Sequence, residues 1–384
     1  MPSRRDVVAG FTTAVVTVPL AAAFGGTAAA APSGGTGRPR ERGPIVIGHR
    51  GASGYRPEHT LGSYELAARL DADYLEPDLV MTKDGVLVCR HEPEIGGTTD
   101  VAQHPEFAAR KTTKQLDGAP FTGWFAEDFT LAELKTLRAV ERLPDVRQHN
   151  TLFDGRYEIP TFQELLDLRK RLSIELGRAI GVYPETKHPT YFQKLGMPLE
   201  QPLVDILQRN DLNKSSAPVF VQSFEVTNLG RLRSLGLRTA AVQLLSATGA
   251  PYDTVAAGKD HPTYADLATS DGLKNIVAGY AQGIGPDKLQ VIPRSANGTL
   301  GQPTTLVADA HAAGLVVHPY AFRAENIFLP VDYQRGTVRS DYGRAIDEQV
   351  TYLRTGLDGL FTDQADIGVL ARADFLAAAS AGGS

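Results

Sequence analysis

The chain has 384 residues, of which 42% are hydrophobic and 22% are charged, and its formal net charge is −5. These values are typical of a globular protein, and a mildly negative chain without a Lys/Arg block argues against nucleic acid or an anionic membrane surface as the main partner. The single cysteine, Cys89, excludes an intrachain disulfide, so a large core must supply stability.

Residues 1–31 have the pattern of an export signal. Arg4 and Arg5 precede a short apolar stretch, and Ala28–Ala31 is typical of a cleavage site. The paired arginines favour the twin-arginine route, and the apolar run is short for a membrane span. We therefore expect an exported protein of the extracellular, periplasmic or cell-wall space, without stable membrane insertion. A flexible Pro-, Gly- and Ser-rich linker is expected over 32–44.

Short apolar or β-branched runs then alternate with helical stretches. Eight runs predict strands: 45–47, 74–78, 181–185, 219–222, 239–244, 283–285, 315–318 and 359–362. Two of the segments between them contain capping boxes, which begin at Thr130 and Thr161 and mark helix N-termini. This alternation predicts a (β/α)8 TIM barrel over 45–375, followed by a C-terminal tail over 376–384.

A ninth strand-like run ends at His91 and does not fit the alternation. It follows Asp84-Gly85, a strong signal for a two-residue hairpin turn. A hairpin closed there places Asp78 opposite His91, as an arm attached to the second barrel strand. The long stretch over about 92–157 predicts an inserted subdomain on the face that carries the functional loops. Four aromatic residues are expected to form its small core, with a substrate platform as the alternative: Phe121, Trp124, Phe125 and Phe129.

Charged residues gather where the first three strands and the hairpin arm end. They are His49, Arg50, Glu76, Asp78, His91, Glu185 and Lys187. The carboxyl ends of barrel strands converge, so the carboxylates of Glu76, Asp78 and Glu185 could form an all-oxygen site for Ca²⁺ or Mg²⁺. Arg50 and Lys187 suit an anionic oxygen ligand. His49 and His91 are candidates for proton transfer, and the whole set describes phosphoryl-ester cleavage.

These residues lie in motifs that resemble the glycerophosphodiester phosphodiesterases, most closely the exported, periplasmic type. The similar segments are HRGASGYRPEHTL from His49, LEPDLVMTKDG from Leu75, YPETK from Tyr183, YAQGIGPD from Tyr280, LVVHPY from Leu315 and GLFTD from Gly359. The resemblance implies metal-dependent hydrolysis of small-molecule glycerophosphodiesters to glycerol 3-phosphate and an alcohol. It implies one divalent cation, and export favours Ca²⁺ over Mg²⁺.

The resemblance also implies a role for each clustered residue. Glu76, Asp78 and Glu185 match the metal carboxylates of the family. His49 and His91 match its catalytic histidines, which we assign as base and acid. Arg50 and Lys187 match positions near the phosphate. The family commonly has Asp after the second histidine, where this chain has Glu92.

Residues at later strand ends are further candidates. Gln222, Phe224 and Tyr320 are predicted to contact the glycerol or the phosphate, with packing at the barrel mouth as the alternative. His59 and Thr60 are interpreted as structural, with Thr60 capping the next helix. Wall teichoic acid is a second candidate substrate. There are two candidate nucleophiles. One is the neighbouring glycerol hydroxyl, which would give a cyclic phosphate, and the other is water.

Three other kinds of protein share part of this pattern. A sphingomyelinase D-like phospholipid-cleaving enzyme should need an apolar groove or membrane-facing loops. A barrel glycosidase could use two carboxylates but would not need two cations and two histidines. A non-catalytic secreted binding protein would be expected to have lost at least one of the seven clustered residues, all of which are present.

Overall fold

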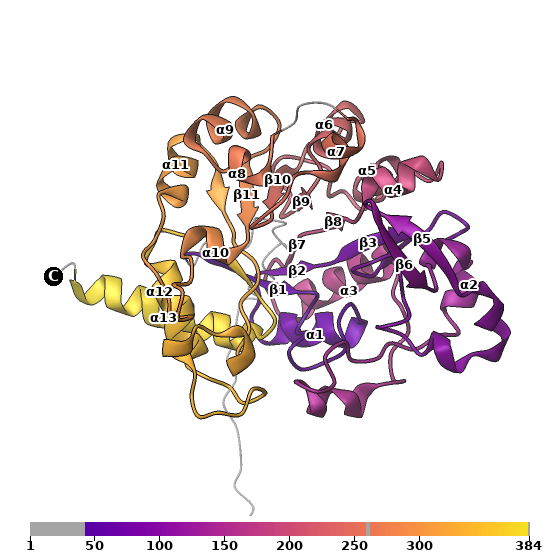
Figure 1. The fold of residues 1–384 in the computed structure, drawn as a ribbon, viewed down its shortest axis with the longest axis horizontal. Helices are drawn as coiled ribbons and strands as arrows, with labels where there is room; N and C mark the ends of the chain where they lie inside the picture. The colour runs from indigo at the N-terminus through magenta and orange to yellow at the C-terminus, as the bar shows by residue number, and fades with distance from the viewer. Residues whose placement is uncertain (1–42, 259–261, 383–384) are drawn as a thin grey trace, which may run out of the picture. The chain divides into compact units, whose positions relative to one another are not determined.

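The computed structural model describes residues 43–258 and 262–382, so the predicted signal peptide and nearly all of the predicted linker lie outside the described residues. Eight parallel staves surround one interior (Figure 1). In chain order they are β1 (Ile45–His49), β2 with β3 (Tyr74–Glu76, Asp78–Met81), β7 with β8 (Gly181–Val182, Glu185–Thr186), β9 (Phe220–Ser223), β10 (Ala240–Leu245), β11 (Gly283–Pro286), β12 (Val316–Val317) and β13 (Gly359–Thr362). All eight predicted strands are confirmed.

Backbone hydrogen bonds connect these staves into a ring. Two staves are interrupted at Pro77 and Pro184, where proline has no N–H to donate. The second and third staves nevertheless stay joined, since the Glu185 N–H donates to the Pro77 carbonyl at 2.9 Å. β1 pairs in parallel with both β2 and β13. The Phe361 N–H reaches the Pro319 carbonyl at 3.1 Å, which closes the predicted barrel between β12 and β13.

Helices cover the outside of the strands (Figure 1). They are α1 (Leu61–Arg69), α2 (Leu131–Leu134), α3 (Phe162–Glu175), α4 (Pro189–Lys194), α5 (Glu200–Arg209), α6 (Val226–Ser234), α7 (Tyr252–Ala256), α8 (Tyr264–Leu267), α9 (Ser270–Asn275), α10 (Lys288–Val291), α11 (Leu306–Ala312), α12 (Ala345–Leu353) and α13 (Ala365–Gly382). The predicted capping boxes of α2 and α3 are both present, and Thr60 caps α1 as predicted. The predicted C-terminal tail continues α13 as far as Gly382. None of the described helices is long and apolar enough to cross a membrane.

Aromatic side chains fill the interior of the barrel below the strand ends. Ile47, Tyr74, Tyr183, Val242 and Phe361 form one buried cluster contributed by five different staves. The Tyr183 hydroxyl lies 3.0 Å from His318 Nδ1, so two polar groups in this layer satisfy each other. The layer forms a solid floor, and polar side chains at the carboxyl ends of the strands are left to line a pocket above it.

The hairpin arm is present, but its predicted register was wrong by one residue. β4 (Leu87–Cys89) runs antiparallel to β3, with Leu79 opposite Cys89. Asp78 therefore lies opposite Arg90 instead of His91, and the Arg90 N–H donates to the Asp78 carbonyl at 3.0 Å. The reason is the turn, which has three residues with Gly85 at φ +81°, where the Asp-Gly signal predicted two.

The inserted segment that follows the hairpin lies against the barrel. It contains η1 (Val101–Gln103), η2 (Pro105–Arg110), β5 (Thr112–Leu116), β6 (Ala119–Gly123), η3 (Ala126–Asp128), α2 and η4 (Gln148–Phe153). The expectation of a small separate core was wrong. Trp124 and Phe129 belong to the same buried cluster as residues of β3, β4 and α3, and Phe121 is 42% exposed.

Candidate active site

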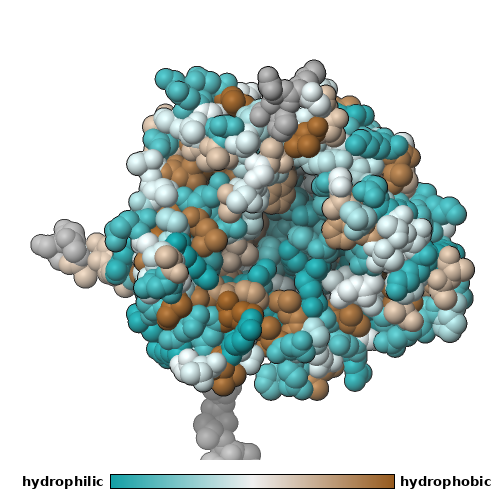
Figure 2. All heavy atoms as spheres, viewed as in Figure 1, coloured by the Kyte–Doolittle hydropathy of each residue, from teal (hydrophilic) through white to brown (hydrophobic). Residues whose placement is uncertain are grey.

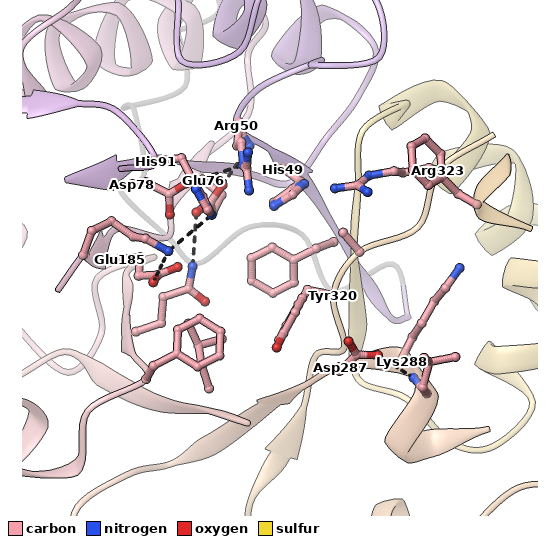
Figure 3. Close-up of a pocket in the computed structure, with 18 of the residues that line it drawn as sticks. His49, Arg50, Glu76, Asp78, His91, Glu185, Asp287, Lys288, Tyr320 and Arg323 are labelled. Atoms are coloured by element: carbon pink, nitrogen blue, oxygen red, sulfur yellow. Dashed lines mark hydrogen bonds and ion pairs between the residues drawn. The ribbon is translucent and has the colours of Figure 1, made fainter. Parts of the chain in front are cut away.

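A pocket of about 410 Å³ lies at the carboxyl ends of the staves. In Figure 2 it appears as a hollow lined largely by hydrophilic residues, and Figure 3 shows its side chains. All ten residues predicted for the site line it: His49, Arg50, Glu76, Asp78, His91, Glu185, Lys187, Gln222, Phe224 and Tyr320. The structure thus brings together side chains from the first four staves, the hairpin arm and the loop after β12.

Three buried carboxylates form the centre of the pocket. Glu76, Asp78 and Glu185 each offer an oxygen within 4.8 Å of the others. Burial and the neighbouring carboxylates raise the pKa of Glu76 well above its usual value. Burial and Asp78 also raise the pKa of Glu185 to about 8, although Lys187 opposes the shift. A cation among the three carboxylates would favour their charged forms and so lower these pKa values.

The donor chemistry of this cluster fits a hard divalent cation. All three groups are oxygen donors on rigid strand ends, as Ca²⁺ and Mg²⁺ prefer. Gln222 adds an amide, whose Nε2 donates to Glu76 Oε1 at 3.3 Å. Its own Oε1 is buried without a hydrogen-bond partner among the described residues. Glu76, Asp78 and Glu185 are therefore the residues that would hold the cation.

Two cations flank the carboxylates. Arg50 adopts φ 60°, a strained conformation for a residue other than glycine, and its N–H donates to Glu76 Oε2 at 2.7 Å. Its guanidinium lies 2.9 Å from Glu58 and 3.5 Å from Asp78. Lys187 Nζ lies 2.8 Å from Glu185 Oε1. Both side chains can bind an anionic ligand next to the carboxylate cluster.

His49 ends β1 and is held from behind by a carboxylate. Its Nδ1 lies 2.6 Å from Asp363 Oδ1, so a proton on Nδ1 leaves Nε2 as the unprotonated atom. Burial and Arg50 lower the pKa of His49, while Asp363 opposes the shift. Burial disfavours the charged form of Asp363, but Arg147 and Arg323 hold its pKa well below the usual value. His49 is therefore neutral and oriented.

His91 follows the hairpin arm and has the same kind of arrangement. Its Nδ1 lies 2.5 Å from Glu92 Oε1, so the longer Glu keeps the contact at this position. Its Nε2 lies 3.3 Å from Lys187 Nζ. Desolvation, Arg50 and Lys187 lower the pKa of His91 to about 3, although its side chain is 27% exposed.

An aromatic wall completes the pocket. The rings of Phe224 and Tyr320 meet edge to face with centroids 5.8 Å apart. The Tyr320 hydroxyl donates to the Leu245 carbonyl at 3.1 Å, which fixes this ring. Lys187 Nζ lies 5.5 Å from the centre of the Phe224 ring. Asp287 and Lys288 lie across the pocket from the carboxylate cluster (Figure 3).

Several residues that support the site were not singled out from the sequence. His59 was interpreted as structural, yet its Nε2 lies 2.8 Å from Asp78 Oδ2 and orients that carboxylate. Asp363 directly follows β13 at the end of the GLFTD motif, and this position was the available signal. Arg142 and Arg147 come from the insertion, where no motif marked them.

A (β/α)8 barrel with three buried carboxylates at its strand ends, placed so that they can hold a metal ion, is an arrangement on which many enzymes are built. Residues 49–367 match the model of the glycerophosphoryl diester phosphodiesterase family. A glycerophosphodiester phosphodiesterase of Arabidopsis thaliana is 35% identical over 83% of each chain. One from Haemophilus influenzae is 30% identical over 85% of this chain and 88% of its own. The chain belongs to this family and is a phosphoric diester hydrolase.

Solved structures share the fold. A phosphodiesterase from Silicibacter pomeroyi has a TM-score of 0.60 at 22% identity, covering 88% of this chain and 95% of its own. An Oleispira antarctica phosphodiesterase, solved in complex with the product sn-glycerol-3-phosphate, has a TM-score of 0.55 at 20% identity. The match covers 85% of this chain and 96% of the Oleispira chain.

Proposed function

We propose that the protein hydrolyses glycerophosphodiesters to glycerol 3-phosphate and an alcohol, with one divalent cation and two histidines. The observation that carries this proposal is the placement of two carboxylate-held histidines beside the buried cluster of Glu76, Asp78 and Glu185. The Oleispira neighbour, solved with sn-glycerol-3-phosphate, supports this product.

The cation would supply positive charge against the charge that grows on the phosphate during the reaction. Arg50 and Lys187 bind and orient the anionic phosphate beside it. Asp363 keeps the His49 proton on Nδ1, so Nε2 accepts the proton of the nucleophile. The attacking oxygen bonds to phosphorus while the bond to the alcohol oxygen breaks.

His91 delivers a proton from Nε2 to the departing alkoxide. It is neutral without substrate, because burial, Arg50 and Lys187 lower its pKa. A bound phosphodiester brings negative charge to both cations and so favours protonation of His91. If the nucleophile is the neighbouring glycerol hydroxyl, a cyclic phosphate forms and water then opens it. If the nucleophile is water, glycerol 3-phosphate forms directly.

The pocket favours this activity over the alternatives. A lipid-cleaving relative was expected to need an apolar groove, whereas charged side chains surround this pocket on several sides. A binding protein would not need two histidines that each hold a carboxylate on Nδ1. Family membership adds to both arguments.

We also propose that the protein is exported through its first 31 residues and uses Ca²⁺ there. The support is the paired arginines and the Ala-rich cleavage pattern, which lie outside the described residues. Wall teichoic acid, a polymer with phosphodiester bonds, is a second substrate that this location would provide.

The test is release of glycerol 3-phosphate from glycerophosphocholine before and after exhaustive chelation. We expect activity to disappear with chelator and to return with added Ca²⁺, and less fully with Mg²⁺. Glu76→Gln should stay inactive in every condition. Full activity after chelation, or in Glu76→Gln, would overturn the role of the cation.

A further inference from the structure

One turn of the insertion reaches into the barrel site through two arginines. Arg142 and Arg147 flank this turn, and the Arg147 N–H donates to the Leu143 carbonyl at 2.7 Å. The turn is tied to the loop after β1, because Arg147 Nη1 donates to the Ser53 carbonyl at 3.0 Å. Asn150 donates to the same carbonyl at 3.2 Å. The turn is therefore fixed relative to His49, whose carbonyl accepts the Ser53 hydroxyl at 2.8 Å.

Arg147 holds the carboxylate that holds His49. Its Nη2 donates to Asp363 Oδ2 at 2.6 Å, while Asp363 Oδ1 faces His49 Nδ1. Its Nε donates to Glu325 Oε1 at 2.7 Å, which fixes the guanidinium itself. The Arg147 side chain is only 5% exposed. One oxygen of Asp363 therefore contacts His49 and the other contacts Arg147. The carboxylate cannot rotate away from His49 without breaking its buried ion pair with Arg147.

Arg142 holds the carboxylate that holds His91. Its Nη1 and Nη2 donate to the two oxygens of Glu92, at 3.0 and 2.7 Å, and Glu92 Oε1 faces His91 Nδ1. The same guanidinium donates to Glu58 from Nε at 2.8 Å and from Nη2 at 2.6 Å. The planar guanidinium of Arg142 binds Glu58 and Glu92 in fixed directions and so orients both carboxylates, which the single ammonium charge of a lysine would not do.

We infer that Arg142 and Arg147 are positioning residues, each acting through one histidine. Arg147 acts through Asp363 on the base, and Arg142 acts through Glu92 on the acid. A single turn of the insertion therefore aligns both ends of the proton transfer. The inference rests on the proposed function, because it assigns the arginines to histidines with those roles. It gives the insertion a part in the reaction beyond covering the barrel.

The experiment compares Arg142→Ala and Arg147→Ala on two substrates. Arg138→Ala is the matched control, because Arg138 lies in the same insertion and donates to the backbone carbonyls of Lys135 and Leu137. On glycerophosphocholine we expect kcat to fall by about 10–100-fold in both test variants, which is the usual loss when a residue that orients a functional side chain is removed. The control should keep its rate. On the 4-nitrophenyl ester of glycerol 3-phosphate, Arg142→Ala should regain most of its rate and Arg147→Ala should not.

Double-mutant cycles separate positioning from a general loss of structure. Arg142→Ala should cost far less in a His91→Ala background than in the wild type, with a small remainder through Glu58 and Arg50. Arg147→Ala should cost nothing further in His49→Ala. The crossed pairs should be additive. If an alanine variant shows no native thermal transition, Arg→Lys at that position takes its place, with the same pattern expected. Additive losses in the matched pairs, or unchanged rates in both variants, would overturn the inference. A wild-type chain inactive on both substrates would overturn the proposed function instead.

Discussion

The two histidines differ in how firmly each one is held. Asp363, behind His49, is buried and paired with both Arg147 and Arg323. Glu92, behind His91, is about one quarter exposed and pairs with Arg142. Each group gains and releases a proton in every cycle, but the base must begin with Nε2 unprotonated and the acid with Nε2 protonated. The buried Asp363 holds the Nδ1–H tautomer that the base needs, whereas the partly exposed His91 can take up its proton from solvent. This contrast favours His49 as the base and His91 as the acid.

Substitution of each histidine by alanine should separate these roles. On glycerophosphocholine we expect both variants to lose about 10²–10⁴-fold in kcat, as is typical for general acid–base groups. A nitrophenolate leaving group needs little protonation, so His91→Ala should recover on that substrate and His49→Ala should stay slow. Recovery of His49→Ala instead would exchange the two roles. Undiminished rates in both variants would remove the histidines from the chemistry.

A buried acid outside the site should make stability depend on pH. Burial, with Asp253 nearby, raises the pKa of Glu225 to about 8, although Thr190 donates a hydrogen bond to its Oε2 at 2.6 Å. The folded protein keeps this proton up to about pH 8, whereas the unfolded chain releases it at about pH 4.3. The stabilisation is complete below the lower value and is lost as pH rises through the higher one.

We therefore expect the free energy of unfolding to fall between pH 5.5 and 8.5, since each unit of pKa difference corresponds to about 1.4 kcal/mol. Glu225→Gln cannot ionise and should show a smaller fall, measured by urea unfolding at both pH values. The exposed Glu175→Gln is the control and should keep the wild-type difference. Identical falls in all three proteins would contradict the assignment.

Single residues were predicted where a motif or a strand end marked them. All ten predicted residues line one pocket, because the carboxyl ends of parallel staves must converge. Arg142 and Arg147 were not predicted, because their partners lie on other segments and nothing local in the sequence signals such a pair. His59 shows the same limit, since its contact to Asp78 depends on the position of α1 relative to β3.

Among the elements, the β3–β4 hairpin sets the position of His91 and depends on Gly85. This residue has φ +81°, and a Cβ added there would meet no atom within 4 Å. The cost of Gly85→Ala should therefore come from backbone strain alone, at about 1 kcal/mol in urea unfolding. Gly97→Ala is the control, because its Cβ also meets nothing within 4 Å and its φ is not positive. Equal losses in both variants would contradict the role of the turn.

Strand existence and helix starts were predictable, but strand register was not. The eight apolar runs and the two capping boxes depend on local sequence, and all of them appear in the structure. The register of the hairpin depends on whether its turn has two or three residues, and Asp-Gly is compatible with both. One residue of error moved the partner of Asp78 from His91 to Arg90.

For the molecule as a whole, cation binding should appear as stability. Glu76 and Asp78 lie on the second stave and Glu185 on the third, so a cation among them would tie these two staves together. A cation that binds only the folded state stabilises it by about 2.7 kcal/mol at a hundred times its Kd. We expect Ca²⁺ to raise Tm in a concentration-dependent way, and Mg²⁺ to do so less. Glu185→Gln should weaken this response.

Asp287→Asn provides the control for that measurement, because Asp287 lines the same pocket but lies outside the carboxylate cluster. It should keep the wild-type rise in Tm. A rise of equal size in wild type, Glu185→Gln and Asp287→Asn would show that the ion acts elsewhere.

The barrel closes by joining β1 to β13, and this has a consequence for biosynthesis. His49 and Asp363, which form one hydrogen bond, are 314 residues apart in the chain. While the chain emerges from the ribosome, the acidic cluster is complete once residue 185 has been made, yet β1 still has an open edge and His49 has no carboxylate behind it. Such long-range closure folds slowly, and an open edge invites aggregation. A nascent or prematurely terminated chain could therefore gather the cation ligands long before it could catalyse, and the ability to turn over substrate is among the last properties that translation confers.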